Sequence, residues 1–311
     1  MGIGVGYIAA CATLFSWTIG TFAFTRASQL VNPASVNRVR LLYAFIALSC
    51  IVMVMNSYSP INLFTTISVE QYFWFGLSGF IGLTLGDYFA FTAYRILGGR
   101  RTSLFGCFAP GAALMAANLL IGEHINFIGI VGMSVSVFGI MLLVLSRKEK
   151  TQSKVADKAE YTKGILFGAL GAICQGVGLV LAKKGFSISG DGFSPIYATW
   201  IRMFLASVCV YIIGAFTTNL WTEFKLVSTT IKNLKPILLG TLFGPIIGVS
   251  SSLLTATYLE ASVAQTLFSL LPVSVLFASV IFFKEKVPFQ SYLAVLVSII
   301  GVLILVWRNQ F

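Results

Sequence analysis

The chain has 311 residues, of which 57% are apolar and only 10% are charged. Soluble domains contain about 25% charged residues, so this composition excludes a water-soluble globule, a disordered chain and a disulfide-bonded scaffold. The net charge of +11 comes from 21 Lys and Arg against 10 Asp and Glu. Because the basic residues lie between apolar segments, they are interpreted as topology signals and as contacts to anionic lipids, and no nucleic-acid binding is predicted.

Ten apolar segments follow one another along the chain, and each is long enough to cross a bilayer as a helix of about 20 residues. They are 3–24, 34–55, 71–93, 103–122, 126–146, 163–182, 195–216, 235–258, 262–283 and 288–307. The alternation of polar and apolar residues that an outer-membrane barrel needs is absent. The sequence therefore predicts an all-α integral membrane protein with ten transmembrane helices. The first segment lacks a preceding basic residue and a clear cleavage site, so it is interpreted as a span and not as a secretory signal.

The cysteines predict neither a disulfide framework nor a metal site. All five lie inside apolar segments, and no C-x-x-C pair is present. They are interpreted as small buried apolar side chains, and no cofactor is predicted.

The two halves of the chain repeat each other. Pro33 and Arg40 recur 162 positions later as Pro195 and Arg202. The same offset relates Gly82, Gly86, Pro110, Glu123 and Gly139 to Gly244, Gly248, Pro272, Glu285 and Gly301. We expect a first five-helix repeat at 1–146, a charged linker at 147–162 and a second repeat at 163–311. Because five is odd, the second copy must enter the membrane inverted, which is a common plan of secondary transporters with a substrate site between the halves.

The loops also carry a topology signal. Most of their Lys and Arg residues follow odd-numbered segments, whereas the opposite side holds only Lys183, Lys184 and Arg308. Since positive loops stay in the cytoplasm, this distribution places both termini outside.

Several segments resemble those of a known family. SVNRVRLLYAF and its counterpart ATWIRMFLASV are similar to the start of the second helix in EamA-type members of the drug/metabolite transporter superfamily. GLTLGDYFAFTAYRILGGRRTSLFGCFAP resembles the passage from the third to the fourth helix of that family. LLIGEHINFIGIVGMSVSVFGIMLL and IFFKEKVPFQSYLAVLVSIIGVLIL resemble its "Gly-Glu, then Gly-rich fifth helix" ending. The resemblance covers nearly the whole chain as two tandem units.

The resemblance implies ten helices, alternating access, and export or uptake of small metabolites, without fixing the substrate. It implies a cavity formed chiefly by spans 1, 3, 4, 6, 8 and 9. Family members are commonly drawn with both termini in the cytoplasm, which opposes the charge count, so the orientation stays open.

Asp87 and Arg40 are the most informative charged residues. Asp87 lies about 9 Å below the end of the third segment, and Arg40 lies at a similar depth in the second. An ionised group at that depth costs several kcal/mol unless it is paired or faces water. We expect the two to pair or to face the central cavity, either as a proton site or substrate-amine contact or as a structural ion pair. The equivalent place in the second repeat, residues 248–252, has no acid.

Arg202 repeats Arg40 without a matching acid. A guanidinium is suited to bind a carboxylate or phosphate of a substrate. The alternative is that Arg202 reaches the lipid headgroups or bonds to carbonyls at a helix end.

Glu123 and Glu285 end the fourth and ninth segments. They either cap or brace the turn into the next helix, which the resemblance favours, or act at a gate. His124, the only histidine, is either a proton relay or an ordinary interfacial residue.

Other polar, aromatic and proline residues lie within the apolar segments. Candidates to line a cavity, as opposed to lipid-facing or packing residues, are Trp17, Tyr88, Tyr94, Asn118, Gln175 and Tyr258. Pro110 and Pro272 are mid-segment, where proline loosens a helix, and act either as hinges or as static kinks. The Gly82-x-x-x-Gly86 and Gly244-x-x-x-Gly248 pairs allow helices to approach closely.

Alternative functions have weaker support. The GLSG sequence at 76–79 superficially resembles an intramembrane serine protease, with His124 as a base. Neither an HExxH motif nor a P-loop is present. A channel or a structural membrane protein is a further alternative.

The favoured interpretation is not an enzyme but a secondary transporter in a bacterial cytoplasmic membrane. It would move amino acids or related small metabolites by efflux, driven either by protons or by the gradient of the substrate itself.

Overall fold

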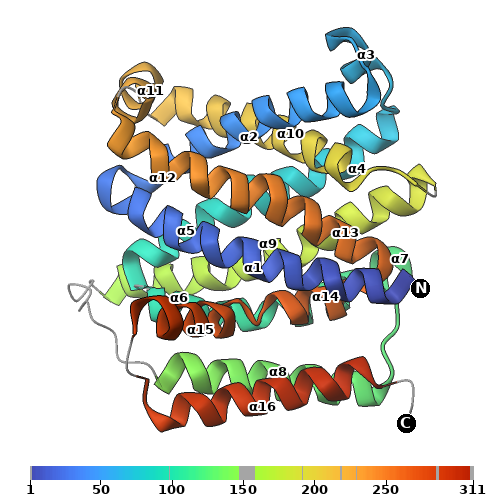
Figure 1. The fold of residues 1–311 in the computed structure, drawn as a ribbon, viewed down its shortest axis with the longest axis vertical. Coiled ribbons are helices and arrows are strands. Elements are labelled where there is room, and N and C mark those ends of the chain that lie inside the picture. The colour runs from blue at the N-terminus through green and yellow to red at the C-terminus, as the bar shows by residue number, and fades with distance from the viewer. Residues whose placement is uncertain are drawn as a thin grey trace. The chain divides into compact units, whose positions relative to one another are not determined.

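The computed structural model describes residues 2–97, 99–146, 158–190, 192–217, 219–228, 230–284 and 287–308. Every regular element in those ranges is a helix (Figure 1). The elements before the central linker are α1 Gly2–Leu30, α2 Pro33–Asn56, α3 Pro60–Thr65, α4 Val69–Gly79, η1 Phe80–Gly86, α5 Asp87–Leu97, α6 Gly99–Phe105, η2 Gly106–Phe108, α7 Ala109–Ile121 and α8 Phe127–Ser146. Those after it are α9 Lys158–Ser189, α10 Pro195–Thr217, α11 Leu220–Ser228, α12 Ile231–Thr241, η3 Leu242–Val249, α13 Ser250–Tyr258, α14 Ala261–Phe268, α15 Leu271–Phe283 and α16 Phe289–Val306.

The predicted all-α membrane class is confirmed. Within the described residues, nine helices are long and apolar enough to cross a bilayer. The tenth predicted span, 71–93, lies in the continuous helical run α4–η1–α5. The glycines and Asp87 within 71–93 lower the mean hydropathy of this segment.

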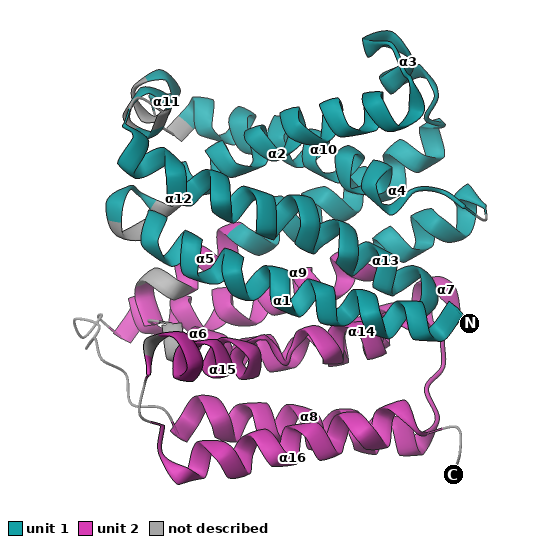
Figure 2. Ribbon diagram, viewed as in Figure 1, with its two compact units in different colours: residues 1–87, 181–258 teal, residues 88–180, 259–311 magenta. Residues whose placement is uncertain are grey.

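The helices form two compact units, which divide the chain differently from the sequence repeats (Figure 2). Unit 1 contains Met1–Asp87 and Leu181–Tyr258, and unit 2 contains Tyr88–Val180 and Leu259–Phe311. Each unit therefore combines helices from both repeats. The proposed division of the chain at its charged linker stays a prediction about the repeats.

In unit 1, α2 packs along α10, and α1 packs against α12, η3 and α13. The centre of the α2–α10 contact is Trp200, which is fully buried and stacks on Phe204 with ring centroids 5.7 Å apart. Its indole Nε1 donates to the Ser49 hydroxyl at 2.7 Å. Phe45, which precedes Ser49 in α2, contacts Phe204, which follows Trp200 in α10, so the two helices run antiparallel.

In unit 2, α8 and α16 pack along most of their length (Figure 2). Glycine makes this close approach feasible, because a Cβ on Gly139 or Gly301 would overlap the backbone of Ser298 or Ser136. A second contact joins α7 to α14 through a cluster of Ala113, Ala117, Val180 and Ala261.

The 162-residue offset recurs in the boundaries of the helices. It relates the first residues of α2 and α10 and both ends of α7 and α15. The residues that follow α7 and α15, Gly122 and Lys284, both have left-handed backbones with φ of 68° and 51°. The 162-residue offset also relates η1 to η3. These two segments are π-helical, with wide turns that were not predicted from the sequence. Pro245 within η3 has no N–H to donate, which interrupts the normal ladder.

Two short helices and one boundary also differ from the prediction. The short helices α3 and α11 lie in regions interpreted as loops. The helix α3 has a recognisable start, because the Ser59 hydroxyl accepts a hydrogen bond from the Asn62 N–H at 3.2 Å. Helix α9 begins at Lys158, so residues 158–162 of the predicted linker are helical, and residues 147–157 lie outside the described part.

Candidate substrate and ion site

The predicted Arg40–Asp87 ion pair is present in unit 1. Asp87 is the first residue of α5, directly after the wide turns of η1, and Arg40 lies two turns into α2. An Arg40 Nη donates to the Asp87 carboxylate, and each side chain is 13% exposed. The Arg40 Nε donates to the Asn37 side chain at 2.7 Å. Arg40 also lies over the Phe24 ring, 5.3 Å from its centroid. The pair offsets the cost of holding both charges away from water.

Arg202 lies on α10 in a different environment. Its side chain is 5% exposed, and its Nε has no hydrogen-bond partner among the residues that the structure describes. The Asp87 carboxylate, which Arg40 already binds, acts on it electrostatically. The role of Arg202, in binding a substrate anion or at the headgroups or helix-end carbonyls, stays a prediction.

Close packing by the third span explains why Arg202 is buried. A Cβ on Gly79 would lie 2.9 Å from the Arg202 Cα, so only glycine lets α4 approach α10 at this point. One turn further along, the Thr84 hydroxyl donates to the Ala206 carbonyl at 3.4 Å. The α4–η1 run therefore covers the face of α10 that carries Arg202.

Trp17 also belongs to unit 1. Its indole lies against the backbone of η3, where a Cβ on Gly248 would overlap it. The neighbouring Ser16 hydroxyl donates to the Phe243 carbonyl at 2.6 Å, which fixes α1 on η3. Tyr258 is in the same unit but at the end of α13, where it is 44% exposed and packs on Gly2.

The remaining candidates belong to unit 2 and are dispersed. Tyr88 is 56% exposed and contacts the Phe167 ring. Gln175 is half-buried on α9, beside Gly176, which packs on α7. Asn118 is exposed and shares a hydrogen bond of 2.7 Å with His124 Nδ1. The side chain of Tyr94 lies outside the described residues.

Pro110 and Pro272 lie within their spans, as the sequence suggested, next to irregular turns of the helix. The fourth and ninth segments are each interrupted just before the proline, at Gly106–Phe108 and at 269–270. Each proline occupies the first turn of the helix that follows, where its missing N–H costs no hydrogen bond. A role of these breaks as hinges or as static kinks stays a prediction.

Glu123 caps a helix of the other repeat. Its carboxylate accepts a hydrogen bond from the Ala261 N–H, the first residue of α14, at 2.9 Å. Glu123 thus braces the start of α14. Its counterpart Glu285 lies outside the described residues.

One ion pair was missed by the sequence analysis. The Arg308 guanidinium donates to the Glu260 carboxylate at 2.6 Å, and the Arg308 carbonyl accepts from the Asn126 side chain at 2.9 Å. Glu260 directly precedes α14, Asn126 directly precedes α8, and Arg308 follows α16. The only indication of this pair in the sequence was the distribution of Lys and Arg in the loops, which placed Glu260 and Arg308 on the same side of the membrane.

A family model now decides the class of the chain. The model of the EamA-like transporter family matches residues 4–145 and again 162–307. The chain belongs to the EamA-like transporter family. This confirms the resemblance drawn from the quoted segments, and it makes the chain a multi-pass integral membrane transporter of the drug/metabolite transporter superfamily. The family is one of transporters.

A solved structure supports the fold of this EamA-family chain. It is described only as a crystal structure of a protein, and it superposes with a TM-score of 0.74 at 14% identity, covering 97% of each chain. At this identity the likeness concerns the fold alone. No curated protein matches the chain.

Within the described residues, no group of three or more His, Cys, Asp or Glu side chains could hold a metal ion.

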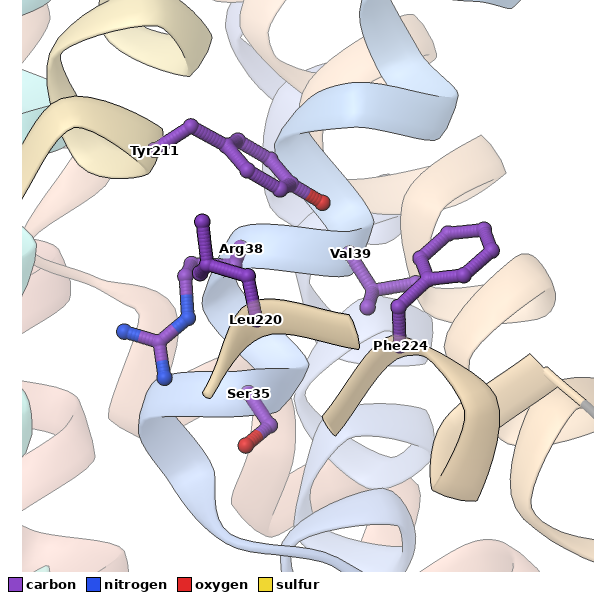
Figure 3. A pocket seen from close by; sticks show the side chains of 6 residues that line it. All are labelled: Ser35, Arg38, Val39, Tyr211, Leu220 and Phe224. Carbon is purple, nitrogen blue, oxygen red and sulfur yellow. The ribbon is translucent and has the colours of Figure 1, made fainter. Parts of the chain in front are cut away.

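A small cavity in unit 1 of this EamA-family transporter is less suited to bind a metabolite. Figure 3 shows a cavity between α2, α10 and α11, with Arg38 and Tyr211 in its lining. Its volume of about 10 Å³ is roughly what one water molecule needs. The charged groups of Arg40, Asp87 and Arg202 lie outside this lining.

Proposed function

We propose that this EamA-family transporter is a secondary carrier that exports a small organic metabolite, an amino acid or a related compound, by alternating access across a bacterial cytoplasmic membrane. The observation that carries the proposal is the set of intramembrane charges in unit 1, Arg40, Asp87 and Arg202. Such charges are expensive in a membrane and commonly mark substrate and ion pathways.

The repeated architecture supports the same mechanism. Secondary transporters commonly consist of repeats with interrupted helices near the substrate site. Here η1 ends immediately before Asp87, and its counterpart η3 packs against Trp17. Wide π-helical turns are frequent at functional sites, because they change the direction of the side chains that follow.

The experiment that tests the proposal is counterflow in proteoliposomes. Vesicles loaded with one compound of an amino-acid and metabolite panel should accumulate the same labelled compound faster than empty vesicles. A carrier shows this stimulation, because the loaded binding site returns across the membrane. A channel, the second candidate, would give equal rates with loaded and empty vesicles, and the absence of all substrate-dependent flux would reject the transporter proposal for the panel compounds.

The proposed coupling ion is the proton, carried by Asp87. Asp87→Asn keeps the size of the side chain but removes its titration, so substrate accumulation driven by a pH gradient should be lost while exchange persists. Glu70→Gln is a matched control, because Glu70 is an exposed acid in the first turn of α4. If Asp87→Asn retained full pH-driven accumulation, Asp87 would not be the proton carrier.

A further inference from the structure

The membrane-embedded interior of unit 1 contains a buried arginine whose charge is incompletely balanced. Arg202 is 5% exposed, and its Nε has no hydrogen-bond partner in the described part of the chain. A buried charge that is only partly balanced in such a place costs several kcal/mol. Replacing it with an apolar residue would remove that cost, so a buried arginine without its own acid is expected to have an anionic partner in part of its working cycle.

The charges of Arg40, Asp87 and Arg202 do not balance one another. Asp87 is the acid that acts on Arg202, yet its carboxylate accepts a hydrogen bond from Arg40. Two guanidinium groups and one carboxylate leave one net positive charge. A single negative group beside Arg202 would neutralise the set.

The comparison of the two repeats indicates where the missing acid would be. The 162-residue offset relates Arg40 to Arg202 and Asp87 to Val249. The second repeat thus keeps the arginine but replaces its acid with a buried apolar side chain. The Ser250 hydroxyl donates to Thr199, which lies one turn before Arg202, at 3.2 Å, and the Thr199 hydroxyl donates to the Pro195 carbonyl at 2.8 Å. These neutral hydroxyls do not balance the charge of the arginine.

We infer that Arg202 binds the anionic group, a carboxylate or a phosphate, of the transported substrate. This inference rests on the proposed carrier function and specifies its substrate class. The planar guanidinium binds both groups through parallel hydrogen bonds, which a lysine cannot reproduce. Because Arg202 supplies the positive charge, the anionic group of the substrate needs no accompanying cation at this position.

The test compares matched compounds, of which one carries a carboxylate or phosphate and the other does not. Thermal unfolding of the purified chain in detergent is measured with benzoate and benzamide, L-phenylalanine and L-phenylalaninamide, and glycerol phosphate and glycerol. At least one acid should raise the melting temperature in a saturable manner, and its neutral partner should not. Arg202→Met should weaken that response at least about tenfold, because a hydrogen bond to a charged group is worth about 1.5–3 kcal/mol. Arg202→Lys should retain part of the response.

Two readouts separate this role from a structural one. Without added acid, Arg202→Met should be at least as stable as the wild type, since it removes an unneutralised buried charge; a structural arginine would instead lower the melting temperature when replaced. Arg308→Met is the matched control, because Arg308 is also buried but is paired with Glu260. It should lose stability and keep the response to acid.

Three results would overturn the inference. They are an absence of stabilisation by every acid, an equal stabilisation by the neutral partners, and an unchanged acid response in Arg202→Met. Stabilisation by phosphatidylglycerol but by none of the soluble acids would also overturn it, because the anion would then be a lipid headgroup. Counterflow distinguishes this failure from that of the carrier: a neutral compound exchanged equally by the wild type and Arg202→Met would reject the anion site and leave the carrier intact.

Discussion

At the scale of single residues, the same side chain occupies two different environments. Arg40 is held by Asp87, by hydrogen bonding to Asn37 and by the Phe24 ring, whereas Arg202 is buried with an unpartnered Nε. The pairing of Arg40 with Asp87 was predictable because both residues were assigned the same depth from the same end of their spans. The burial of Arg202 was not, since it depends on Gly79 and on the approach of α4.

The Arg40–Asp87 pair can be tested by removing one charge or both. Arg40→Met should lower stability by about 3–5 kcal/mol, because Asp87 is left without its main partner, whereas replacing both residues with apolar ones should be close to neutral. Thermal unfolding of Arg40→Met and of the Arg40→Met, Asp87→Leu double variant measures the difference. A purely structural pair predicts that the double variant also regains transport, whereas the proposed role of Asp87 predicts that it stays inactive.

Glu123 provides a further test at the residue scale. Its carboxylate accepts the Ala261 N–H at the start of α14, so Glu123→Ala should cost about 0.5–2 kcal/mol, as the loss of other helix caps does. Glu123→Gln retains an oxygen acceptor and is the matched control, with a smaller loss. Equal melting temperatures for the wild type and Glu123→Ala would show that the cap does not contribute to stability.

At the scale of elements, hydropathy predicted the spans but not their internal breaks. Long apolar runs are strong signals, so the ten segments coincide with helices. The wide turns of η1 and η3 and the break before α7 occur inside such runs, where hydropathy does not change. The helices α3 and α11 were missed because short helices between the spans resemble loops in sequence. The Glu260–Arg308 pair joins the ends of separate hairpins, and a single sequence does not report that proximity.

The contact between α8 and α16 gives a prediction for a whole element. A Cβ on Gly139 would overlap the backbone of Ser298, so Gly139→Ala should force the helices apart and cost about 1–3 kcal/mol. Gly111→Ala is the matched control, because Gly111 lies in helix α7 with no neighbouring atom within 4 Å of its added Cβ. It should stabilise the protein slightly, since alanine favours helix more than glycine does. Melting temperatures in detergent that fell equally for both variants would contradict close packing as the cause.

At the scale of the molecule, sequence repeats and compact units are different divisions of the same chain. Each unit takes helices from both repeats, so the two arginines related by the repeat, Arg40 and Arg202, belong to one unit. Each lies about 10 Å from the start of its helix. Because α2 and α10 run antiparallel, Arg40 lies toward one face of the membrane and Arg202 toward the other. The orientation of the chain therefore decides from which side the anion site is approached.

The distribution of Lys and Arg predicts that orientation. Helix α12 begins beside Lys232, on the side of the odd-numbered loops, whereas Ser187 lies near the end of α9 on the opposite side; both residues are exposed. In a variant without the native cysteines, Ser187→Cys should react in intact cells with a maleimide that cannot cross the membrane, and Lys232→Cys should react only after lysis. Labelling in the reverse order would place both termini in the cytoplasm. Arg202 would then lie toward the cytoplasmic face, where an exporter first meets its substrate, and Arg40 with Asp87 toward the outer face.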